Sequence, residues 1–337
     1  MTQGIRIGIA GLGFMGQTHL TAYQGANTAG FTNTLVAVCD QDSARRRGEI
    51  AGGGNIETGV GTDQLFDPSH VVGYESPDEL FADSSVDLVS ICTPTDSHVE
   101  LALAAIAAGK HVLLEKPAAL NAAALEPLRS AARVAETHVM PAHCIRFWPA
   151  YAFLKACIED NRYGKVESAV FTRLASPPAW NADFYKNSAR SGGALVDLHI
   201  HDTDFIRHCF GEPVGVESAG NLHHITTLYR YSGGPDHVVA EGGWDHTPGF
   251  PFRMAFTVIF EQATIDYDLS RANPLLICSD GNAVPHDVGT LTGYDEEVRH
   301  IIQCITQGKR STCVTIEDAY GTAALLDAER ASLNLKE

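Results

Sequence analysis

The chain has 337 residues, of which 45% are hydrophobic, and its formal net charge is −17 at pH 7. This length exceeds the usual size of one domain, so we expect two domains with sizeable cores. The acidic balance argues against nucleic acid or an anionic membrane surface as a partner, because both are bound through clustered Lys and Arg. The short basic run RRR at 45–47 is interpreted as a solvated first turn of a helix.

The beginning of the chain, MTQGIRIGIAG, has no charged stretch followed by an apolar segment and a cleavage site. The chain also has no run of about 18 apolar residues, the length needed to cross a membrane. We therefore expect a cytoplasmic protein. The 8 cysteines form no C-x-x-C pair and lie mostly in apolar runs, which indicates reduced core thiols and neither disulfides nor a zinc site.

The first part of the chain alternates short β-type runs with helical ones. Strands are expected at 5–10, 34–39, 86–91, 111–114 and 138–142, and helices at 15–24, 43–50, 77–82, 97–108 and 122–136. Strands separated by helices indicate parallel crossovers, so an α/β domain with a doubly wound Rossmann sheet is predicted over 1–142. The Gly-, Asp- and Thr-rich stretch at 51–74 is interpreted as an insertion beside the adenosine end of a cofactor site.

The remainder, 143–337, is predicted to form an α+β domain. After a helix at 150–161, β-type runs follow at 166–176, 214–220, 225–231, 237–244, 253–261 and 263–269. Consecutive strands with short turns indicate a large, mostly antiparallel open sheet. Two helices, at 295–307 and 316–333, are expected to end the chain.

A glycine-rich motif follows the first expected strand. Gly11, Gly13 and Gly16 have the spacing G-x-G-x-x-G, which is typical of a strand-to-helix turn that binds the pyrophosphate of a dinucleotide. The next strand ends at Asp40, whose carboxylate is suited to accept both ribose hydroxyls of an adenosine. The alternative is an ordinary glycine-rich turn, but the strand, turn, helix and terminal acid in this order favour a cofactor.

Two more turns are expected at the carboxyl ends of parallel strands. One is CTPTDSH at 92–98, and the other is EKP at 115–117. Ligands bind at this edge of a doubly wound sheet, so we expect Lys116 to point toward the nicotinamide end of the site. Pro117 restricts Lys116 to extended backbone angles. The alternative is an ordinary surface lysine at a strand end.

A third group of reactive side chains lies in SGGALVDLHIHDTD at 191–204. A helix there would place Asp197 and His201 four residues apart on one face. A carboxylate orients a histidine ring and stabilises its cation, and such a pair is the usual general acid and base near neutral pH. Two alternatives remain: Asp197 as a helix N-cap, or a metal bound by His199, His201 and Asp204.

Together these motifs resemble those of the glucose-fructose oxidoreductase, inositol dehydrogenase and rhizopine-catabolism (Gfo/Idh/MocA) family. The match runs in order through GIAGLGFMGQTH, the acid at position 40, CTPTDSH, EKP and GGALVDLHIHDTD. The resemblance implies that Lys116, Asp197 and His201 are catalytic and that Lys116–Pro117 is a cis peptide. It also implies that the open sheet forms a homodimer or homotetramer.

Two positions depart from the family pattern. Ser191 replaces the first of three glycines, and His199 stands where a glycine is common. The second imidazole keeps the metal interpretation open, although we expect no metal.

We expect NAD as the cofactor, because Asp40 would repel the 2′-phosphate of NADP. NADP is the alternative, because Arg45 and Arg46 lie just beyond Asp40 and could pair with that phosphate. The expected cofactor contacts are Gly11, Gly13, Phe14, Met15, Gly16, Asp40, Thr93, Pro94, His98, Glu115 and Lys116. The expected substrate contacts are Lys116, Arg146, Arg173, Trp180, Asp197 and His201.

The predicted function is hydride transfer between the cofactor and a secondary alcohol of a sugar, inositol or related polyol. His201 would take the hydroxyl proton, Asp197 would steady the imidazolium, and Lys116 would stabilise the developing alkoxide. Two other functions are kept open: a ligand-sensing regulator that has lost catalysis, and an NAD-dependent glycosidase. The intact catalytic residues argue against the regulator.

Overall fold

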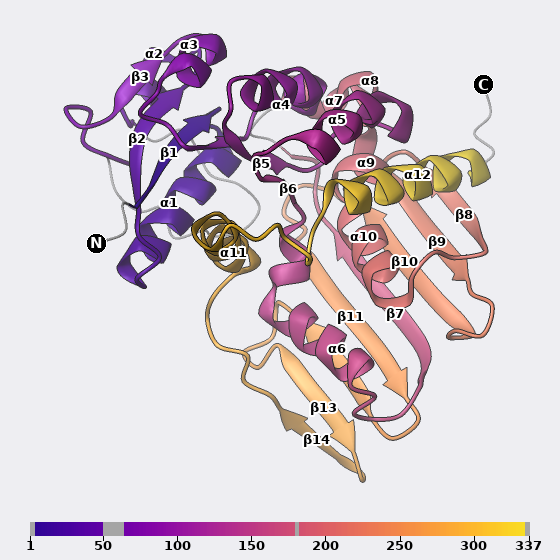
Figure 1. The fold of residues 1–337 in the computed structure, drawn as a ribbon. Coiled ribbons are helices and arrows are strands. Elements are labelled where there is room, and N and C mark those ends of the chain that lie inside the picture. Colours follow the sequence, from indigo (N-terminus) through magenta and orange to yellow (C-terminus); the bar gives the residue numbers. More distant parts are fainter. Residues whose placement is uncertain (1–3, 50–63, 179–181, 334–337) are drawn as a thin grey trace. The chain divides into compact units, whose positions relative to one another are not determined.

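The structure is a computed structural model that describes residues 4–49, 64–178 and 182–333. The chain divides into two compact units (Figure 1). The first comprises Met1–Cys144 and Gly293–Tyr320, and the second comprises Ile145–Thr292 and Gly321–Glu337. Most of the expected insertion at 51–74 lies outside the described residues.

The first unit is built on a six-stranded parallel sheet with the order β3-β2-β1-β4-β5-β6. This is the Rossmann order, in which the chain reverses direction along the sheet between β1 and β4. The strands are β1 (Ile5–Ala10), β2 (Asn33–Cys39), β3 (Val72–Tyr74), β4 (Leu88–Ile91), β5 (His111–Glu115) and β6 (Val139–Ala142). The central strands are mostly apolar, with 0% exposure at Ile9, Val89 and Leu113, as expected for a sheet covered on both faces.

The helices of the first unit join these strands, and three of them begin at a side-chain cap. Asp42, Ser76 and Asn121 each accept a backbone N–H of the first turn, which satisfies a donor that lacks a partner within the helix. The helices are α1 (Phe14–Thr28), α2 (Ser43–Arg46), α3 (Pro77–Ala82), the 3-10 turn Thr95–Ser97, α4 (His98–Ala107), α5 (Ala122–Val134) and α11 (Gly293–Gln307).

Helix α11 is the element whose place differs most from the sequence-based expectation. The sequence analysis placed it in the second domain, whereas it packs against α1 in the first unit. Its buried face includes Glu297, Val298, Ile301 and Ile302. The position of α11 in the sequence therefore does not predict the unit to which it belongs, because its apolar face packs against a helix from the beginning of the chain.

The second unit contains an eight-stranded sheet with the order β14-β13-β12-β11-β7-β10-β9-β8. Neighbouring strands are antiparallel except β7 and β10, which are parallel. The strands are β7 (Val166–Leu174), β8 (Gly215–Asn221), β9 (His224–Arg230), β10 (His237–Gly243), β11 (Arg253–Phe260), β12 (Thr264–Asp268), β13 (Leu275–Ser279) and β14 (Asn282–Pro285).

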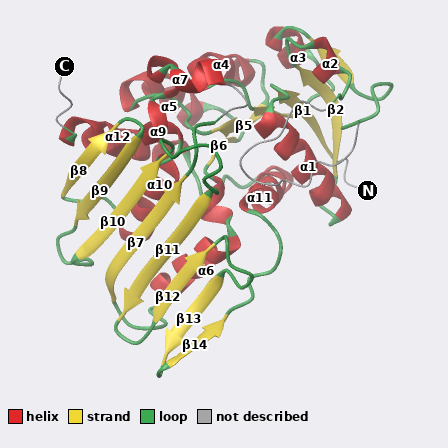
Figure 2. Cartoon of the chain, turned by 180° about the vertical axis from the view of Figure 1, so that it is seen from behind, coloured by secondary structure: helices red, strands yellow, loops and turns green. Residues whose placement is uncertain are grey.

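Helices cover one face of this sheet, as Figure 2 shows. Residues of one parity on β11, such as Met254, Phe256 and Val258, are buried, whereas their neighbours are partly or fully exposed. Tyr151 of α6 packs edge to face on Phe256 with ring centroids 4.9 Å apart. The elements are the 3-10 turn Cys144–Phe147, α6 (Pro149–Glu159), α7 (Ala182–Lys186), α8 (Ser188–Ser191), α9 (Gly193–Asp197), α10 (Ile200–Phe210) and α12 (Ile316–Ser332), which begins in the first unit.

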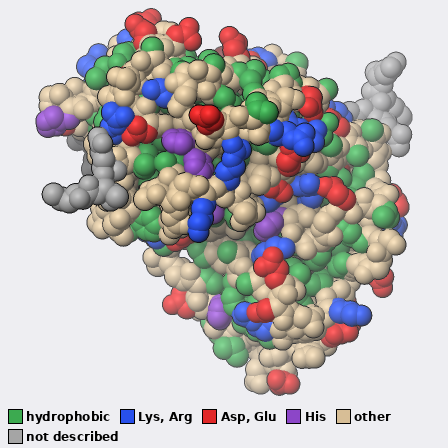
Figure 3. Space-filling model, viewed as in Figure 1, with side chains coloured by type: hydrophobic (Ala, Val, Ile, Leu, Met, Phe, Trp, Pro, Cys, Tyr) green, Lys and Arg blue, Asp and Glu red, His purple; other side chains and the backbone are tan. Residues whose placement is uncertain are grey.

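Two surface properties bear on possible partners. Among the described residues, no helix combines the length and the apolar character needed to span a bilayer. Acidic and basic side chains are interspersed on the face seen in Figure 3, which differs from the clustered basic surface of a nucleic-acid-binding protein.

Candidate active site

The glycine turn between β1 and α1 is shaped by backbone crowding at two positions. Gly11 has φ +87°, and a Cβ there would lie 2.7 Å from the carbonyl oxygen of Cys92. A Cβ on Gly16 would lie 1.9 Å from the carbonyl oxygen of Gly11. A Cβ on Gly13, in contrast, would have no heavy atom within 4 Å. The first and third glycines are thus required by the fold, and the second leaves open space beside the turn.

The start of α1 presents backbone donors to that space. Gly13 is its N-cap residue, no side chain caps the helix, and its first turn contains no acidic residue. This contrasts with the side-chain caps of α2, α3 and α5. A helix start that has no side-chain cap and carries the positive end of the helix dipole is suited to bind an anion such as a pyrophosphate.

Asp40 lies beside this turn, just after β2. Its carboxylate accepts hydrogen bonds from Leu12 N at 2.7 Å and from Asp42 N at 2.9 Å. Arg45 lies 3.7 Å from the same carboxylate, and Arg46 donates to the carbonyl oxygen of Asp40 at 2.6 Å. The acid is therefore held in a defined position next to the glycine turn, where an adenosine ribose is expected.

His98 joins the two turns that follow β4 and β5. Its ring nitrogens lie 2.7 Å from the carbonyl oxygen of Pro117 and 2.8 Å from that of Thr93. The side chain is buried, and burial lowers its pKa against the opposing effect of these carbonyl groups. The structure thus places His98, an expected cofactor contact, between two loops of the protein, where it fixes their separation.

Lys116 follows β5 at the carboxyl edge of the parallel sheet, and its bond to Pro117 is cis. Its backbone N–H donates to Glu115 Oε2 at 3.1 Å. Glu115 was expected to contact the cofactor, but it is 5% exposed and its other oxygen lies 2.9 Å from His19 Nε2. Glu115 therefore supports the turn that carries Lys116. Sequence reasoning missed His19 and its neighbour Glu297.

The segment that carries Asp197 and His201 is not one continuous helix. Asp197 is the last residue of α9 and His201 lies in the first turn of α10, with Leu198 and His199 between the two helices. The expected i, i+4 pair on one helix is therefore wrong as a description of the backbone. The alternative that Asp197 caps α10 is also wrong, because His199 occupies that position without a side-chain cap. Both Asp197 and His201 are only partly buried.

Two glycines and a serine set the start of α9. Gly192 and Gly193 have φ +75° and +72°. A Cβ on Gly193 would lie 2.4 Å from the carbonyl oxygen of Leu222. Ser191 is fully buried and its hydroxyl accepts from Gly193 N at 3.2 Å. The side chain of the serine that departs from the family pattern thus accepts a hydrogen bond from the backbone at the start of α9.

His199, the second departure, points into the interior of the second unit. Its Nε2 lies 2.9 Å from Glu329 Oε2 and 3.3 Å from the Tyr229 hydroxyl, and the side chain is fully buried. Gly242 leaves room for it, since a Cβ there would lie 2.7 Å from His199 Nδ1. His199 is therefore a partner of α12.

Two expected substrate contacts are arginines in buried ion pairs. Arg146 donates twice to Asp204, at 2.7 Å each, and Arg173 donates twice to Asp202, at 2.9 Å each. These side chains are at most 2% exposed. The pairs attach α10 to the rest of the second unit, and we withdraw both arginines from the substrate contacts. Trp180 lies outside the described residues.

The metal alternative does not find its ligands together. Asp204 is paired with Arg146 and also accepts from Thr322 at 2.8 Å. Among the residues that the structure describes, two other groups have ligand atoms within 4.8 Å of one another: His224, Asp245 and His246, and His19, Glu115 and Glu297.

In the first of these groups, His224 lies between two carboxylates, at 2.8 Å from Asp245 and 3.1 Å from Glu241. Partial burial lowers its pKa, but the two hydrogen bonds outweigh this effect and raise it above the usual value. This arrangement suits an imidazolium held by two acids.

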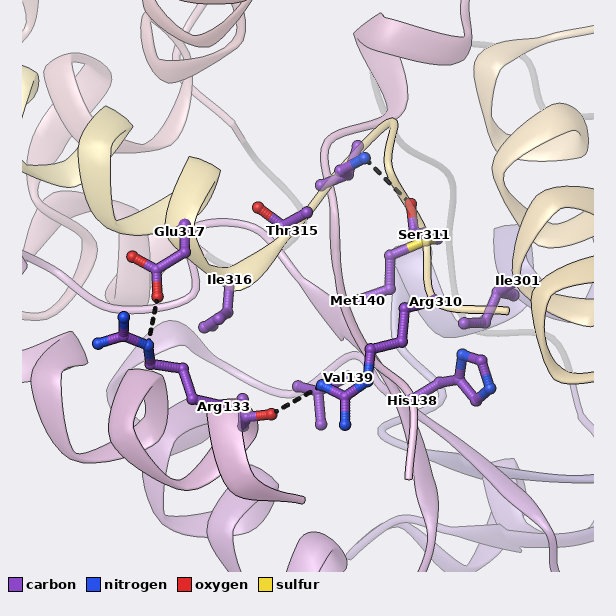
Figure 4. Close-up of a pocket in the computed structure, with 12 residues that line it drawn as sticks. Arg133, His138, Val139, Met140, Ile301, Arg310, Ser311, Thr315, Ile316 and Glu317 are labelled. Carbon is purple, nitrogen blue, oxygen red and sulfur yellow. Dashed lines mark hydrogen bonds and ion pairs between the residues drawn. The ribbon is translucent and has the colours of Figure 1, made fainter. Parts of the chain in front are cut away.

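A pocket in the first unit lies at the opposite edge of the sheet from the glycine turn (Figure 4). It is lined by residues at the amino end of β6, such as Val139, and by the segment 310–317. Arg133 pairs with Glu317 at 3.3 Å, and Arg310 donates to carbonyl oxygens of Ala132 and Ala135. Because cofactors bind at the carboxyl edge of such sheets, this pocket is separate from the candidate active site.

The comparisons with known proteins agree with the fold and with the glycine turn. Residues 5–143 match the model described as the oxidoreductase family with an NAD-binding Rossmann fold, and residues 151–266 match the GFO/IDH/MocA C-terminal domain. The chain belongs to the Gfo/Idh/MocA family of oxidoreductases. Its cofactor is NAD, and the open glycine turn, the uncapped helix start and Asp40 fit that cofactor.

Inositol 2-dehydrogenase of Rhizobium meliloti (strain 1021) is 32% identical over 249 residues, which cover 70% of this chain and 68% of that protein. The scyllo-inositol 2-dehydrogenase (NAD(+)) of Bacillus subtilis (strain 168) is 31% identical over 241 residues, 68% of this chain and 61% of the relative. Levoglucosan dehydrogenase in complex with NADH and levoglucosan has a TM-score of 0.80 at 21% identity, with 98% of this chain and 97% of that one covered.

Proposed function

We propose that this chain is an NAD-dependent dehydrogenase of a secondary alcohol in a sugar, inositol or related polyol. The observation that carries the proposal is that this member of the family retains Lys116 after β5 together with Asp197 and His201. The names of the relatives support this substrate class, since several are inositol dehydrogenases. In this proposal the part of the chain at 1–142, completed by α11, binds the dinucleotide, and the second unit, which holds most of 143–337, provides the substrate-binding and oligomer-forming domain.

Three side chains would carry the chemistry on the substrate. In oxidation, a ring nitrogen of His201 accepts the hydroxyl proton while the carbon-bound hydrogen leaves as hydride, and a carbonyl group forms. Asp197 stabilises the resulting imidazolium. The Lys116 ammonium donates a hydrogen bond to the substrate oxygen, where negative charge grows in the transition state. Bound NAD supplies the nicotinamide ring that takes up or returns the hydride.

The cofactor contacts in the proposal are those that line the glycine turn and the two turns after β4 and β5. The α1 backbone from Gly13 would hold the pyrophosphate, Asp40 would accept the ribose hydroxyls, and Thr93 and Pro94 would border the nicotinamide side. Glu115 and His98 would act from behind, by fixing the turn of Lys116.

A panel of sugars, inositols and polyols tests the proposal. The purified protein is incubated with each compound and NAD, and NADH formation is followed by its absorbance, with chromogenic glycosides in parallel wells. Net NADH formation with at least one polyol is expected. Release from a glycoside without net NADH would instead identify a glycosidase, and compound-dependent NADH binding without turnover would identify a sensor.

We further propose a cytoplasmic homodimer or homotetramer assembled through the open face of the second sheet. The eight cysteines are free thiols, as is usual in a reducing compartment. The face of the sheet opposite the helices carries the half-buried side chains of Val170, Val239 and Leu228, with polar neighbours such as Thr172 and Thr226, and we propose that it contacts a second sheet.

A further inference from the structure

Three titratable side chains that the proposed chemistry does not use lie together behind the turn of Lys116. They are His19 of α1, Glu115 at the end of β5 and Glu297 of α11, and we call them the buried triad. One nitrogen or oxygen of each lies within 4.8 Å of the others. Their side chains are 0%, 6% and 0% exposed.

Both ring nitrogens of His19 lie beside polar groups of the first unit. Its Nδ1 lies 3.3 Å from Ser90 Oγ, which lies 2.8 Å from the Tyr23 hydroxyl, and its Nε2 lies 2.9 Å from Glu115 Oε1. One set of proton positions satisfies all three contacts: Tyr23 donates to Ser90, Ser90 donates to Nδ1, and Nε2–H donates to Glu115.

Glu115 is the ionised member of the triad. It accepts from the His19 ring on one oxygen and from the backbone N–H of Lys116 on the other. Burial raises the pKa of Glu115, but the hydrogen bond from His19 and the electrostatic effects of His19, Lys116 and His98 together outweigh burial, and its pKa lies below the usual value. One negative charge therefore lies directly behind the lysine.

Glu297 has a different environment. Neither of its carboxyl oxygens has a hydrogen-bond partner among the described residues, and the approach to His19 Nε2 is 3.8 Å. Burial raises the pKa of Glu297 far above its usual value, and the like charge of Glu115 raises it further. An ionised carboxylate without partners is strongly disfavoured in such a site.

The titratable groups that face Glu297 come from three elements of the first unit. They are His19 and Tyr23 of α1, Cys92 after β4, and Glu115 at the end of β5. Burial raises the pKa of the Cys92 thiol and of the Tyr23 hydroxyl, so both stay neutral. The negative charge of Glu115 has the same sign as an ionised Glu297 and opposes its ionisation.

We propose that Glu297 remains protonated at neutral pH and is a positioning residue for Lys116. As a neutral acid, Glu297 packs against the Glu115–His19 pair without adding a charge. The negative charge behind Lys116 is then that of Glu115 alone. Ionisation at high pH places a second negative charge beside Glu115 and disturbs the turn that carries Lys116. The positioning role depends on the proposed function, whereas the protonation state does not.

The protonation state is tested without any substrate through Glu297→Gln. An unfolded glutamate ionises above pH about 4.3, so folding of the wild-type chain takes up one proton at neutral pH. The free energy of unfolding of the wild-type protein therefore falls as pH rises toward the pKa of Glu297 in the folded protein. The variant has no carboxyl group at this position and lacks this decrease. The melting temperature of Glu297→Gln minus that of wild type is expected to grow from pH 5 to pH 8.

Glu296→Gln is the matched control. Glu296 is the preceding residue on α11, its side chain is 38% exposed and it pairs with Arg299 at 3.1 Å. The melting temperature of Glu296→Gln minus that of wild type should not grow from pH 5 to pH 8. A Glu297→Gln difference that stays constant or decreases with pH overturns the proposal. Infrared spectroscopy of the wild-type protein gives a second measurement that needs no variant: absence of a protonated carboxyl band at pH 7 also overturns it.

The positioning role is tested by the dependence of kcat on pH, once a substrate has been found. The alkaline limb of the Glu297→Gln profile is expected to lie at higher pH than that of wild type, by a tenfold or greater change in proton concentration. If the alkaline limbs of the two kcat profiles lie at the same pH, the positioning role is rejected, whereas the proposed protonation of Glu297 is unaffected. A failed substrate screen would affect the proposed function alone, because the melting and infrared results do not depend on it.

Discussion

Asp40 illustrates how a single side chain has two consequences at the residue scale. It accepts the Leu12 N–H and so attaches the glycine turn to the end of β2. Its negative charge also lies where a 2′-phosphate of NADP would be placed. The nearby arginines do not present a free phosphate site, since Arg46 donates to the carbonyl oxygens of Asp40 and Gln41.

We therefore expect kcat/KM with NAD to exceed that with NADP by about tenfold or more, a difference that corresponds to a modest like-charge penalty. The measurement is a pair of saturation curves for the two cofactors at one fixed concentration of the substrate found in the screen. Equal efficiencies would show that Arg45 reorients to neutralise the phosphate.

Replacing Lys116 by Met is expected to reduce kcat by about a hundredfold or more, because the ammonium acts on an oxygen whose charge grows in the transition state. NADH affinity, measured by fluorescence titration, should change little. Lys165→Met, at an exposed position of the second unit, is the control. Near-normal turnover by Lys116→Met would contradict the proposed catalytic role.

The sequence predicted the glycines, Asp40 and Lys116 because each belongs to a local motif at a strand end. It gave no comparable signal for Glu297, whose contact with His19 depends on a helix from near the other end of the chain. Arg146 and Arg173 were expected to contact a sugar because they lie in segments flanking the catalytic run and a polyol needs polar partners. In the structure they instead satisfy aspartates of α10.

At the scale of elements, the turn between β1 and α1 contains glycines that are needed for two different reasons. Gly16 is needed for the close packing of α1 on the turn, because a Cβ would lie 1.9 Å from the Gly11 carbonyl oxygen. Gly13 has open space beside it, so the fold without cofactor tolerates a methyl group there.

Gly13→Ala and Gly16→Ala make a matched pair. Gly13→Ala is expected to keep the wild-type melting temperature but to weaken NADH binding, since its methyl group occupies the space expected for the pyrophosphate. Gly16→Ala should lower both the melting temperature and the affinity. Thermal unfolding and NADH fluorescence titration measure the two effects. Unchanged NADH affinity in Gly13→Ala would argue against a pyrophosphate at this turn.

The periodicity of apolar residues predicted the long helices and strands well. It failed where the contacts of individual side chains determine the backbone conformation. The helix expected through Asp197 and His201 breaks at Leu198 and His199, where the buried histidine reaches Glu329. The short strands β3, β13 and β14 were not expected. β14 is exposed throughout, so it has no alternation of apolar and polar residues to detect.

For the molecule as a whole, the open face of the second sheet is the surface that we propose as the interface between subunits. Val170 lies near the middle of this face, opposite Val239 of β10 and Thr257 of β11 in the strand register. These side chains are only partly buried.

We expect the mass measured by light scattering at micromolar concentration to be that of a dimer or tetramer. Val170→Glu should lower this mass, because a carboxylate placed in an apolar interface loses its hydration. Val134→Glu, at a position of α5 that is 82% exposed, should leave the mass unchanged. A monomeric wild-type protein would rule out this assembly.

The placement of α11 has a consequence for how the protein is made. The chain leaves the first unit after Cys144, builds nearly all of the second, and returns at Gly293. During synthesis the NAD-binding unit therefore waits, with the inner face of α1 uncovered and His19 without Glu297, until nearly half of the chain has followed it out of the ribosome. Domains generally fold as they emerge, the first one first. Here the unit that starts first finishes late, and a ribosome-bound chain that ends before α11 should bind chaperones through α1.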